Sequence, residues 1–314
     1  MSNRQQVTIE AEGFSVGYDG NVVLSTGKVE LTGNVIALAG HNGAGKSTFM
    51  KALLGLLPPE SGQLRARNAN TGELLRPERH MAFCPETGSV FSDITVKEYL
   101  KLWCRLKAPR GNYFQQEGAE LLEVLELYPL LPKKGRELSK GQKQRVQTAA
   151  GFFTNPLFFL FDEPFDGLDV QRTHELMNII RERSPNIAFL VSSHRMDVVE
   201  RLADRVLVLQ EGKVKTYGPT NEVSRHLCER MFVIEDCSAP EILREKLEAN
   251  FPESFVYQLG ESIRFASSGT SQEELLGFIR QVDTNGARMS EVSPTLTDAM
   301  SLHLRLLKQD SEIK

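Results

Sequence analysis

The sequence predicts an α/β fold with a largely parallel sheet, followed by a second and smaller α+β domain. Three observations carry this prediction. Short apolar runs read as buried strands at residues 34–39, 157–161, 186–191 and 205–209. Apolar residues at helical spacing fill the intervals between these runs, and such alternation is typical of a parallel sheet with helices on both faces. The pattern then changes near residue 225, where a domain of different organisation is expected to begin.

The first domain is expected over residues 1–222. It starts with two β-rich runs, at 6–16 and 21–31, which are separated by a turn after Tyr18. The apolar strand at 34–39 ends in a glycine-rich loop, and a helix is expected over 47–56. This order predicts a small antiparallel β subdomain beside a parallel core.

The middle of this domain, at about residues 87–150, is expected to be a helical subdomain. Thr95 and Glu98 form the pattern of a capping box at the start of its first helix. A second helix is expected at about 117–127, and a third begins near Ser139. The parallel sheet then resumes, and a hairpin over 206–217 closes the domain.

The second domain, residues 223–314, is expected to be a ferredoxin-like accessory domain. Its elements follow the order β-α-β-β-α-β and are succeeded by a last helix. They are expected at residues 231–235, 240–250, 255–259, 262–266, 272–282, 287–292 and 296–308. No motif in this region predicts a catalytic or ligand-binding site.

Composition excludes several classes of protein. Hydrophobic residues make up 40% and charged residues 25% of the chain, which is ordinary for a soluble globular protein. The formal charge of -4 argues against a dedicated nucleic-acid binder, so no nucleic-acid partner is expected. No apolar run approaches the roughly 18 residues of a membrane-spanning helix. The polar start carries no secretory signal, and the four cysteines form no CxxC pair, which favours a reducing, cytoplasmic setting.

A phosphate-binding loop is the most specific motif. One segment matches the pattern G-x-x-x-x-G-K-[ST] at every required position, follows an apolar strand and opens a helix. It consists of Gly40, His41, Asn42, Gly43, Ala44, Gly45, Lys46, Ser47 and Thr48. Its backbone N–H groups and the helix N-terminus would bind phosphate, Lys46 would reach the β- and γ-phosphates, and Ser47 would ligate Mg²⁺.

Two carboxylates follow the apolar strand at 157–161. A buried strand that ends in paired acids is costly unless a cation or a reacting water is present. Asp162 is therefore expected to hold Mg²⁺, and Glu163 is expected to orient the attacking water or accept its proton. Together with the phosphate loop, this strand end predicts a P-loop nucleotide hydrolase.

A third motif identifies the kind of hydrolase. Leu138, Ser139, Lys140, Gly141 and Gln142 open a further helix between the phosphate loop and the acidic strand. This segment resembles the signature of the ATP-binding cassette (ABC) ATPases, which usually reads Leu-Ser-Gly-Gly-Gln. Lys140 replaces the first glycine, whereas Ser139, Gly141 and Gln142 remain. On its own, Ser139 is also an ordinary helix N-cap, and the two roles are compatible.

The resemblance assigns further residues. It covers about residues 6–220 and implies a RecA-like core with an antiparallel β subdomain and a helical subdomain. Asp169 lies where the family has its D-loop, and His194 matches the switch histidine that contacts the γ-phosphate. Tyr18 falls where the family stacks an aromatic ring on adenine, although it could equally be a turn residue.

One position departs from the usual family pattern. The family usually carries Gln where this chain has Glu86, and a carboxylate there could still ligate Mg²⁺ or orient water. This variant is similar to cassettes of the drug- and polymer-exporting subfamily. Residues 291–298 resemble the "E-x-x-P-T-L-x-D" ending that is common in the same subfamily.

The resemblance implies an ATPase subunit that powers transport, with ATP and Mg²⁺ as its cofactors. Its partners would be a second cassette, expected to be an identical chain, and separate integral membrane permease subunits. Ser139, Gly141, Gln142 and Asp169 would then face the nucleotide of the partner cassette. The subunit would be cytoplasmic and peripheral on the inner face of the membrane, and export is the expected direction.

Three alternative functions are less consistent with the sequence. A soluble cassette ATPase acting on nucleic acid or ribosomes would usually carry two cassettes or a long coiled coil before the signature, and this sequence has neither. A GTPase would carry an Asn-Lys-x-Asp motif, which is missing. A binding module without turnover would not need Glu163 and His194. The soluble ABC ATPase remains the main alternative.

Overall fold

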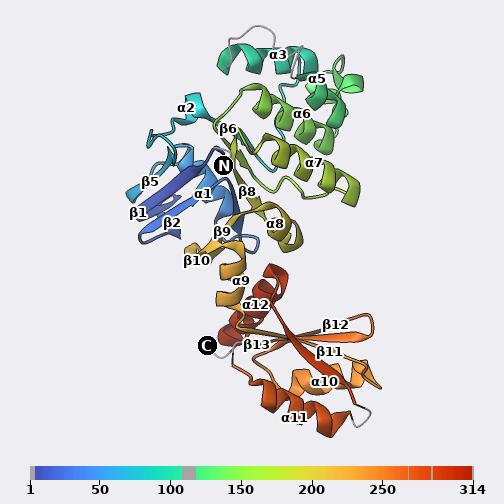
Figure 1. The fold of residues 1–314 in the computed structure, drawn as a ribbon. Helices are drawn as coiled ribbons and strands as arrows, with labels where there is room; N and C mark the ends of the chain where they lie inside the picture. Colours follow the sequence, from blue (N-terminus) through green and yellow to red (C-terminus); the bar gives the residue numbers. More distant parts are fainter. Residues whose placement is uncertain (1–3, 108–117, 268, 284–285, 313–314) are drawn as a thin grey trace. The chain divides into compact units, whose positions relative to one another are not determined.

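The computed structural model describes residues 4–107, 118–267, 269–283 and 286–312. It divides into two compact units (Figure 1). The first comprises Met1–Arg195 and Arg201–Gly218, and the second comprises Met196–Glu200 and Pro219–Lys314. None of the helices in the described ranges has the length and apolarity that a bilayer crossing requires.

An antiparallel group of strands begins the first unit. Strand β1 pairs with β2 and β3 along one side and with β5 along the other, always in antiparallel orientation. These strands are β1 (Val7–Tyr18), β2 (Asn21–Ser25), β3 (Val29–Gly33) and β5 (Ser61–Asn68). Alternating residues of β1 are buried, as expected for a sheet with one face on the core. This group forms the expected antiparallel subdomain.

The parallel core occupies the other part of the same sheet. Its strand order is β9-β4-β8-β7-β6, each neighbouring pair is parallel, and β10 links β9 to β2. The strands are β4 (Val35–Ala39), β6 (Met81–Cys84), β7 (Phe158–Phe161), β8 (Ala188–Ser193), β9 (Arg205–Gln210) and β10 (Lys213–Pro219). The carboxyl ends of the parallel strands meet at one edge, which is where ligands bind in sheets of this kind.

Every residue of β4, β7 and β8 is buried, which explains why these strands read as continuous apolar runs. The rings of Phe159 and Phe161 stack with centroids 4.0 Å apart, and Phe189 stacks on Phe161 at 6.2 Å. Gly151 of α6 packs directly on this cluster, since a Cβ atom there would lie 2.1 Å from the Phe159 ring. The aromatic cluster thus ties the helical side of the unit to the sheet.

Helices and short turns cover the sheet (Figure 1). They are α1 (Lys46–Leu53), α2 (Pro77–His80), α3 (Val96–Lys107), α5 (Gly118–Val124), α6 (Lys140–Phe153), α7 (Val170–Arg183) and α8 (Met196–Leu202), with 3₁₀ turns at Tyr128–Leu130 and Gly135–Glu137. The division between the units runs through α8.

The expected capping box is present, because the Thr95 N–H donates to Glu98 at 2.8 Å and the Glu98 N–H donates to Thr95 at 3.2 Å. Residues 108–117 of the expected helical segment lie outside the described residues.

The second unit contains a four-stranded antiparallel sheet of order β12-β13-β11-β14. In chain order its elements are α9 (Thr220–Leu227), β11 (Arg230–Glu235), α10 (Pro240–Asn250), β12 (Phe255–Leu259), β13 (Ser262–Ser267), α11 (Gln272–Val282), β14 (Arg288–Val292) and α12 (Leu296–Glu312). This is a split β-α-β arrangement. Helices α10 and α11 enclose a core with Phe232 and Phe265, and α12 packs on α9.

The structure confirms the α/β cassette fold, with one expected strand interrupted and one strand that was not expected. The single run expected over residues 21–31 is interrupted at residues 26–28 into β2 and β3, but both strands pair with β1 in one register, from Val16 opposite Leu24 to Val7 opposite Gly33. The Thr26 N–H donates to the Phe14 carbonyl at 2.8 Å, so the chain stays beside β1 through the interruption, and the alternating pattern of the sequence accordingly shows no break. Strand β5 was not expected at all. It pairs along the side of β1 opposite β2 and β3, and its first five residues are exposed or half-buried, so it carries no apolar signal.

Candidate functional site

The phosphate loop connects β4 to α1, as its motif predicts. Gly43 and Gly45 have φ angles of 84° and 102°, which are left-handed conformations that glycine adopts at little cost. The loop closes on itself through the Ala44 N–H, which donates to the His41 carbonyl at 3.1 Å. Helix α1 then begins at Lys46 and has no side-chain cap among the described residues. Its first N–H groups are thus positioned to bind an anion.

Lys46 is held by both the loop and the acidic strand end. It is 6% exposed, and its Nζ donates to the Gly40 carbonyl at 2.8 Å and to the His41 carbonyl at 3.2 Å. The same Nζ lies 3.1 Å from Glu163 Oε1. Burial of the ammonium near a carboxylate fixes its position, and a phosphate at the loop would meet this cation directly.

The two carboxylates after β7 share a partner from the next strand. Ser192 of β8 is fully buried, and its hydroxyl donates to Asp162 Oδ1 at 2.7 Å. The same Oγ accepts a hydrogen bond from the Glu163 N–H at 2.7 Å. Glu163 has a φ angle of 47°, a strained conformation for a residue other than glycine. Ser192 therefore fixes the position of the buried Asp162 carboxylate and of the Glu163 backbone, and the latter sets the direction of the Glu163 side chain.

His194 completes a contact chain through Glu163. Its Nδ1 lies 3.0 Å from Glu163 Oε2, and its N–H donates to the same oxygen at 3.3 Å. Glu163 Oε1 is buried and accepts no hydrogen bond from the described residues, although Lys46 lies within ion-pair distance. One carboxylate thus joins the phosphate-loop lysine to the histidine after β8.

These groups line one cavity of about 440 Å³. Its size is within the usual range for small-ligand sites. Its lining combines backbone donors, one lysine, hydroxyls and carboxylates: Val23, Asn42, Gly43, Gly45, Lys46, Ser47, Thr48, Glu86, Glu163, Asp166 and His194. The predicted residues Lys46, Ser47, Glu86, Glu163 and His194 are therefore brought together.

Oxygen donors of the kind that Mg²⁺ prefers are present at this cavity. The Ser47 hydroxyl and the Glu86 carboxylate line it. Asp162, which precedes Glu163 in the chain, is buried outside this lining, and one of its oxygens accepts from Ser192. The described residues include no cluster of three or more His, Cys, Asp or Glu side chains able to hold a metal alone. That fits Mg²⁺, which is usually bound by one or two protein ligands together with substrate phosphates and water.

The remaining predicted residues lie outside the lining of this cavity. Ser139 is the N-cap of α6, and its Oγ accepts from the Gln142 N–H at 3.3 Å while Gln142 Oε1 accepts from the Ser139 N–H at 3.0 Å. Asp169 caps α7 in the same way, accepting from the Arg172 N–H at 2.8 Å. Tyr18 is 42% exposed at the end of β1. Gly141 also stands apart from the lining.

Sequence reasoning missed two residues of the site, Ser192 and Asp166. Ser192 could have been noticed as a polar residue ending an apolar strand immediately before His194. Its two hydrogen-bond partners, Asp162 and Glu163, lie 30 and 29 residues earlier in the chain, so no local pattern predicts these contacts. Asp166 lies in the segment that contains Asp169, but only its position in the fold places it at the cavity.

A family model described as "ABC transporter" matches residues 29–166. The chain is 32% identical over 189 residues to "Cholesterol transporter ABCA5" of Mus musculus, covering 59% of this chain and 12% of that protein. It is 33% identical over 211 residues to "Molybdenum import ATP-binding protein ModC" of Escherichia coli O6:H1, covering 65% of this chain and 58% of that protein. The chain thus spans only part of each of these relatives.

Solved structures share the fold. "Structure of ATP binding subunit of ABC transporter" matches with a TM-score of 0.61 and 29% identity, covering 70% of this chain and 92% of that one. "Structure of a bacterial Atm1-family ABC exporter with ATP bound" matches with a TM-score of 0.59 and 23% identity, covering 72% of this chain and 40% of that one. The second likeness, at its lower identity, supports the fold alone.

Proposed function

We propose that this chain powers transport through a separate membrane permease. The chain belongs to the ABC transporter family through its ATP-binding cassette. This type of domain binds and hydrolyses ATP. The observation that carries the proposal is the contact chain from Lys46 through Glu163 to His194 in one cavity. Lys46 supplies a cation that can bind phosphate, and Glu163 supplies a carboxylate that can act as a base toward water. Phosphoryl transfer requires both groups.

The loop residues would bind the triphosphate through their backbone N–H groups, and Lys46 would offset charge on the β- and γ-phosphates. Ser47, Asp162 and Glu86 would hold Mg²⁺, which neutralises charge on the phosphate oxygens when it is bound. Glu163 would accept a proton from the water that attacks the γ-phosphorus, while the bond to the ADP oxygen breaks. His194 would contact the γ-phosphate, and Tyr18 would stack on adenine.

Two copies would bind ATP between them. Ser139, Gly141, Gln142 and Asp169 would face the nucleotide held by the second copy, which agrees with their position outside this chain's own cavity. Ser139 and Asp169 are both exposed residues that cap the N-terminus of a helix. Hydrolysis would remove the γ-phosphate that joins the two copies, and the lost contact would open the dimer.

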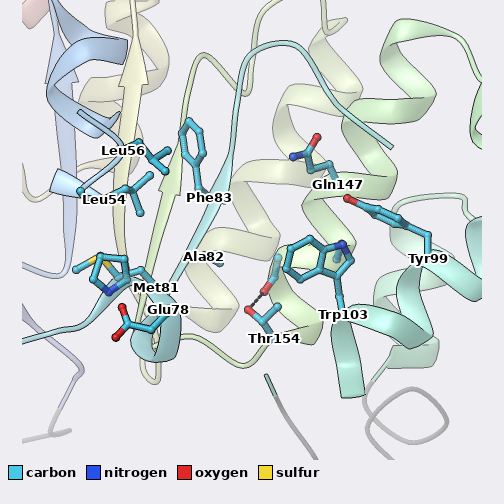
Figure 2. A pocket seen from close by; sticks show the side chains of 14 residues that line it. Leu54, Leu56, Glu78, Met81, Ala82, Phe83, Tyr99, Trp103, Gln147 and Thr154 are labelled. Carbon is cyan, nitrogen blue, oxygen red and sulfur yellow. Dashed lines mark hydrogen bonds between the residues drawn. The ribbon is translucent and has the colours of Figure 1, made fainter. Parts of the chain in front are cut away.

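The permease would dock on an apolar groove in the first unit. Figure 2 displays this groove, which has a volume of about 620 Å³. Trp103 and Tyr99 of α3 face Phe83 of β6 and Leu56 after α1 across it. An apolar hollow with two aromatic side chains is suited to an inserted helix or loop of a partner protein. It lies beside the segment following Glu86, because the Ser89 N–H donates to Gln147 at 2.6 Å and the Ser89 carbonyl accepts from the Tyr99 hydroxyl at 3.2 Å, and both partners line the groove.

Export is the direction we propose, on two features of this sequence. Glu86 stands in the usual position of glutamine, and residues 291–298 resemble the ending of drug- and polymer-exporting cassettes. In the structure, Thr295 and Asp298 of that ending form a capping box for α12, with the Thr295 N–H donating to Asp298 at 2.9 Å. The ending therefore has a structural role in the second unit whatever the direction of transport.

Catalysis is tested with the full chain, ATP and Mg²⁺. Lys46→Ala should lose ATP binding, whereas Glu163→Gln should bind ATP but turn over about 10²–10⁴-fold more slowly. Hydrolysis by Glu163→Gln at the parental rate would contradict the role of Glu163. Stimulation by polynucleotide or ribosomes, but not by any membrane protein, would instead favour a soluble mechanical ATPase.

Docking is tested by reconstitution with a membrane protein that co-purifies with the full chain. Leu56→Asp places a charge in the groove at a side chain that is already 63% exposed, so the fold should tolerate it. We expect it to abolish stimulation by the permease while basal ATPase activity persists. Leu106→Asp is the matched control, since Leu106 is 64% exposed and lies outside the groove lining. Equal loss in both variants would contradict the groove as the docking site.

A further inference from the structure

Glu126 occupies a backbone conformation that usually belongs to glycine. It follows α5 with a φ angle of 50°. The Leu127 N–H donates to the Leu122 carbonyl at 2.7 Å, so the helix ends in a Schellman motif with Glu126 at its left-handed position. Glycine adopts this conformation without strain, whereas a side chain does not. A glutamate here needs a compensating contact.

That contact is a pair of arginines from two other helices. Glu126 Oε2 accepts from Arg145 Nη1 of α6 at 2.5 Å and from Arg172 Nη1 of α7 at 3.0 Å. The same Arg145 nitrogen donates to the Leu125 carbonyl at 3.2 Å, at the open end of α5. One carboxylate oxygen therefore joins three helices of the first unit.

The two arginines favour the charged form of this carboxylate. Hydrogen bonds from Arg172 and then from Arg145 hold the pKa of Glu126 below its usual value. The pair is partly exposed, since the Arg145 side chain is 20% exposed and that of Glu126 is 55% exposed. Salt should therefore weaken the bridge, as it does for other exposed ion pairs.

The bridge lies between the two elements that are expected to meet a second cassette. Arg145 belongs to α6, whose N-cap is Ser139. Arg172 lies in the first turn of α7, where its Nε is 3.5 Å from Asp169 Oδ2, the residue that caps this helix. Ser139 and Asp169 are thus connected within one chain through Glu126.

Apolar packing alone leaves this junction loose. A cavity of about 40 Å³ remains among residues of α6, of α7 and of the segment that precedes α7, including Gly141, Thr148 and Leu168. Gln144 also lines it, and its Oε1 is buried without a hydrogen-bond partner among the described residues. With a gap and an unsatisfied acceptor at the contact, the polar bridge contributes to setting the position of α6 relative to α7.

We propose that Glu126 is a positioning residue that holds α6 and the Asp169 turn in one arrangement, so that Ser139 and Asp169 engage a second copy of the chain together. This inference rests on the proposed function, because it assumes that ATP joins two copies. It assigns Glu126 no contact with nucleotide. Its removal should therefore affect ATP-driven dimerisation and leave nucleotide binding to one copy unchanged.

The test uses the full chain in the Glu163→Gln background, which should preserve the ATP-bound dimer. Dimerisation is followed by sedimentation velocity against ATP concentration, and ADP affinity is measured on the monomer with a fluorescent analogue. Glu126→Gly removes the bridge together with the strain, and Glu126→Gln removes the charge alone. Glu120→Gln is the matched control, because Glu120 pairs with Arg183 at 2.8 Å and thereby ties α5 to α7 without touching α6.

We expect Glu126→Gly and Glu126→Gln to raise the ATP concentration for half-maximal dimerisation about fivefold, the usual scale for a partly exposed ion-pair network. ADP affinity should stay within about twofold of the parent, and the melting temperature of Glu126→Gly should not fall. Glu120→Gln should resemble the parent. Added salt should reduce the difference between the parent and Glu126→Gln.

Three results would overturn the inference. Dimerisation that is unchanged in both Glu126 variants would show that the bridge positions nothing. A joint fall in melting temperature, ADP affinity and dimerisation would show that Glu126 merely supports the fold. If the Glu163→Gln parent itself fails to dimerise with ATP, the proposed function fails first, and the inference falls with it.

Discussion

Replacing Ser192 with alanine should separate turnover from nucleotide binding. The Ser192 hydroxyl is the link between the two carboxylates, donating to Asp162 and accepting from the Glu163 N–H, each at 2.7 Å. The variant removes this oxygen from a fully buried position. Asp162 loses a donor, and the Glu163 N–H loses its acceptor at a strained backbone position.

The magnitude follows from these two lost hydrogen bonds. Leaving a buried polar group without a partner costs about 1–3 kcal/mol, so we expect a destabilisation of about 2 kcal/mol. For a unit of this size that lowers the melting temperature by about 4–8 °C. A small displacement of Glu163 from its water should reduce kcat by about 10- to 100-fold. ATP affinity should persist, because Lys46 and the loop keep their own contacts.

The assay compares kcat, ATP affinity and melting temperature for Ser192→Ala and Ser193→Ala. Ser193 is a suitable control because it is equally buried, and its hydroxyl accepts from the Arg195 N–H at 3.0 Å, away from the carboxylates. Both variants should lose stability, but only Ser192→Ala should lose turnover strongly. Equal kcat values in the two variants would refute the role of Ser192 in aiming Glu163.

The remaining predictions concern packing and cysteine chemistry. Gly151→Ala would place a Cβ atom 2.1 Å from the Phe159 ring, so we expect a loss of about 2–3 kcal/mol in a urea titration; a loss below about 0.5 kcal/mol would contradict this packing. Asp298→Ala removes the acceptor of the Tyr257 hydroxyl at 2.7 Å, and it should lower the melting temperature while the isolated ATPase reaction continues; an unchanged melting temperature would argue against this contact. Burial raises the pKa of the Cys84 thiol to about 12, so iodoacetamide at pH 8 should modify Cys84 only after unfolding, and rapid labelling of the native protein would contradict its burial.

The sequence predicted the parts of the site that depend on local geometry. Lys46 and Ser47 could be assigned because a strand, a glycine-rich loop and a helix N-terminus follow one another in the chain. Glu163 and His194 each follow a buried strand, and the parallel pairing of β7 and β8 brings them together at one sheet edge. Topology of this kind follows from the alternation of strands and helices.

The contacts that the sequence did not predict are long-range or conformational. Ser192 reads as one more residue of a buried strand until β8 is placed beside β7. Glu126 reads as an ordinary surface residue at a helix end, since neither its left-handed backbone nor its two arginines leave a periodic signal. Ser139 and Asp169 are helix caps within this chain, and their contacts with a second copy remain predictions.

The most direct test of the account is the mass of Glu163→Gln with ATP and Mg²⁺, measured by native mass spectrometry of the full chain. If the signature helix of each copy meets the phosphate loop of the other, the predominant species at saturating ATP should be a dimer that carries two nucleotides, and Lys46→Ala should abolish it. A monomer that carries one ATP at saturation, with no dimer at any protein concentration, would contradict the account.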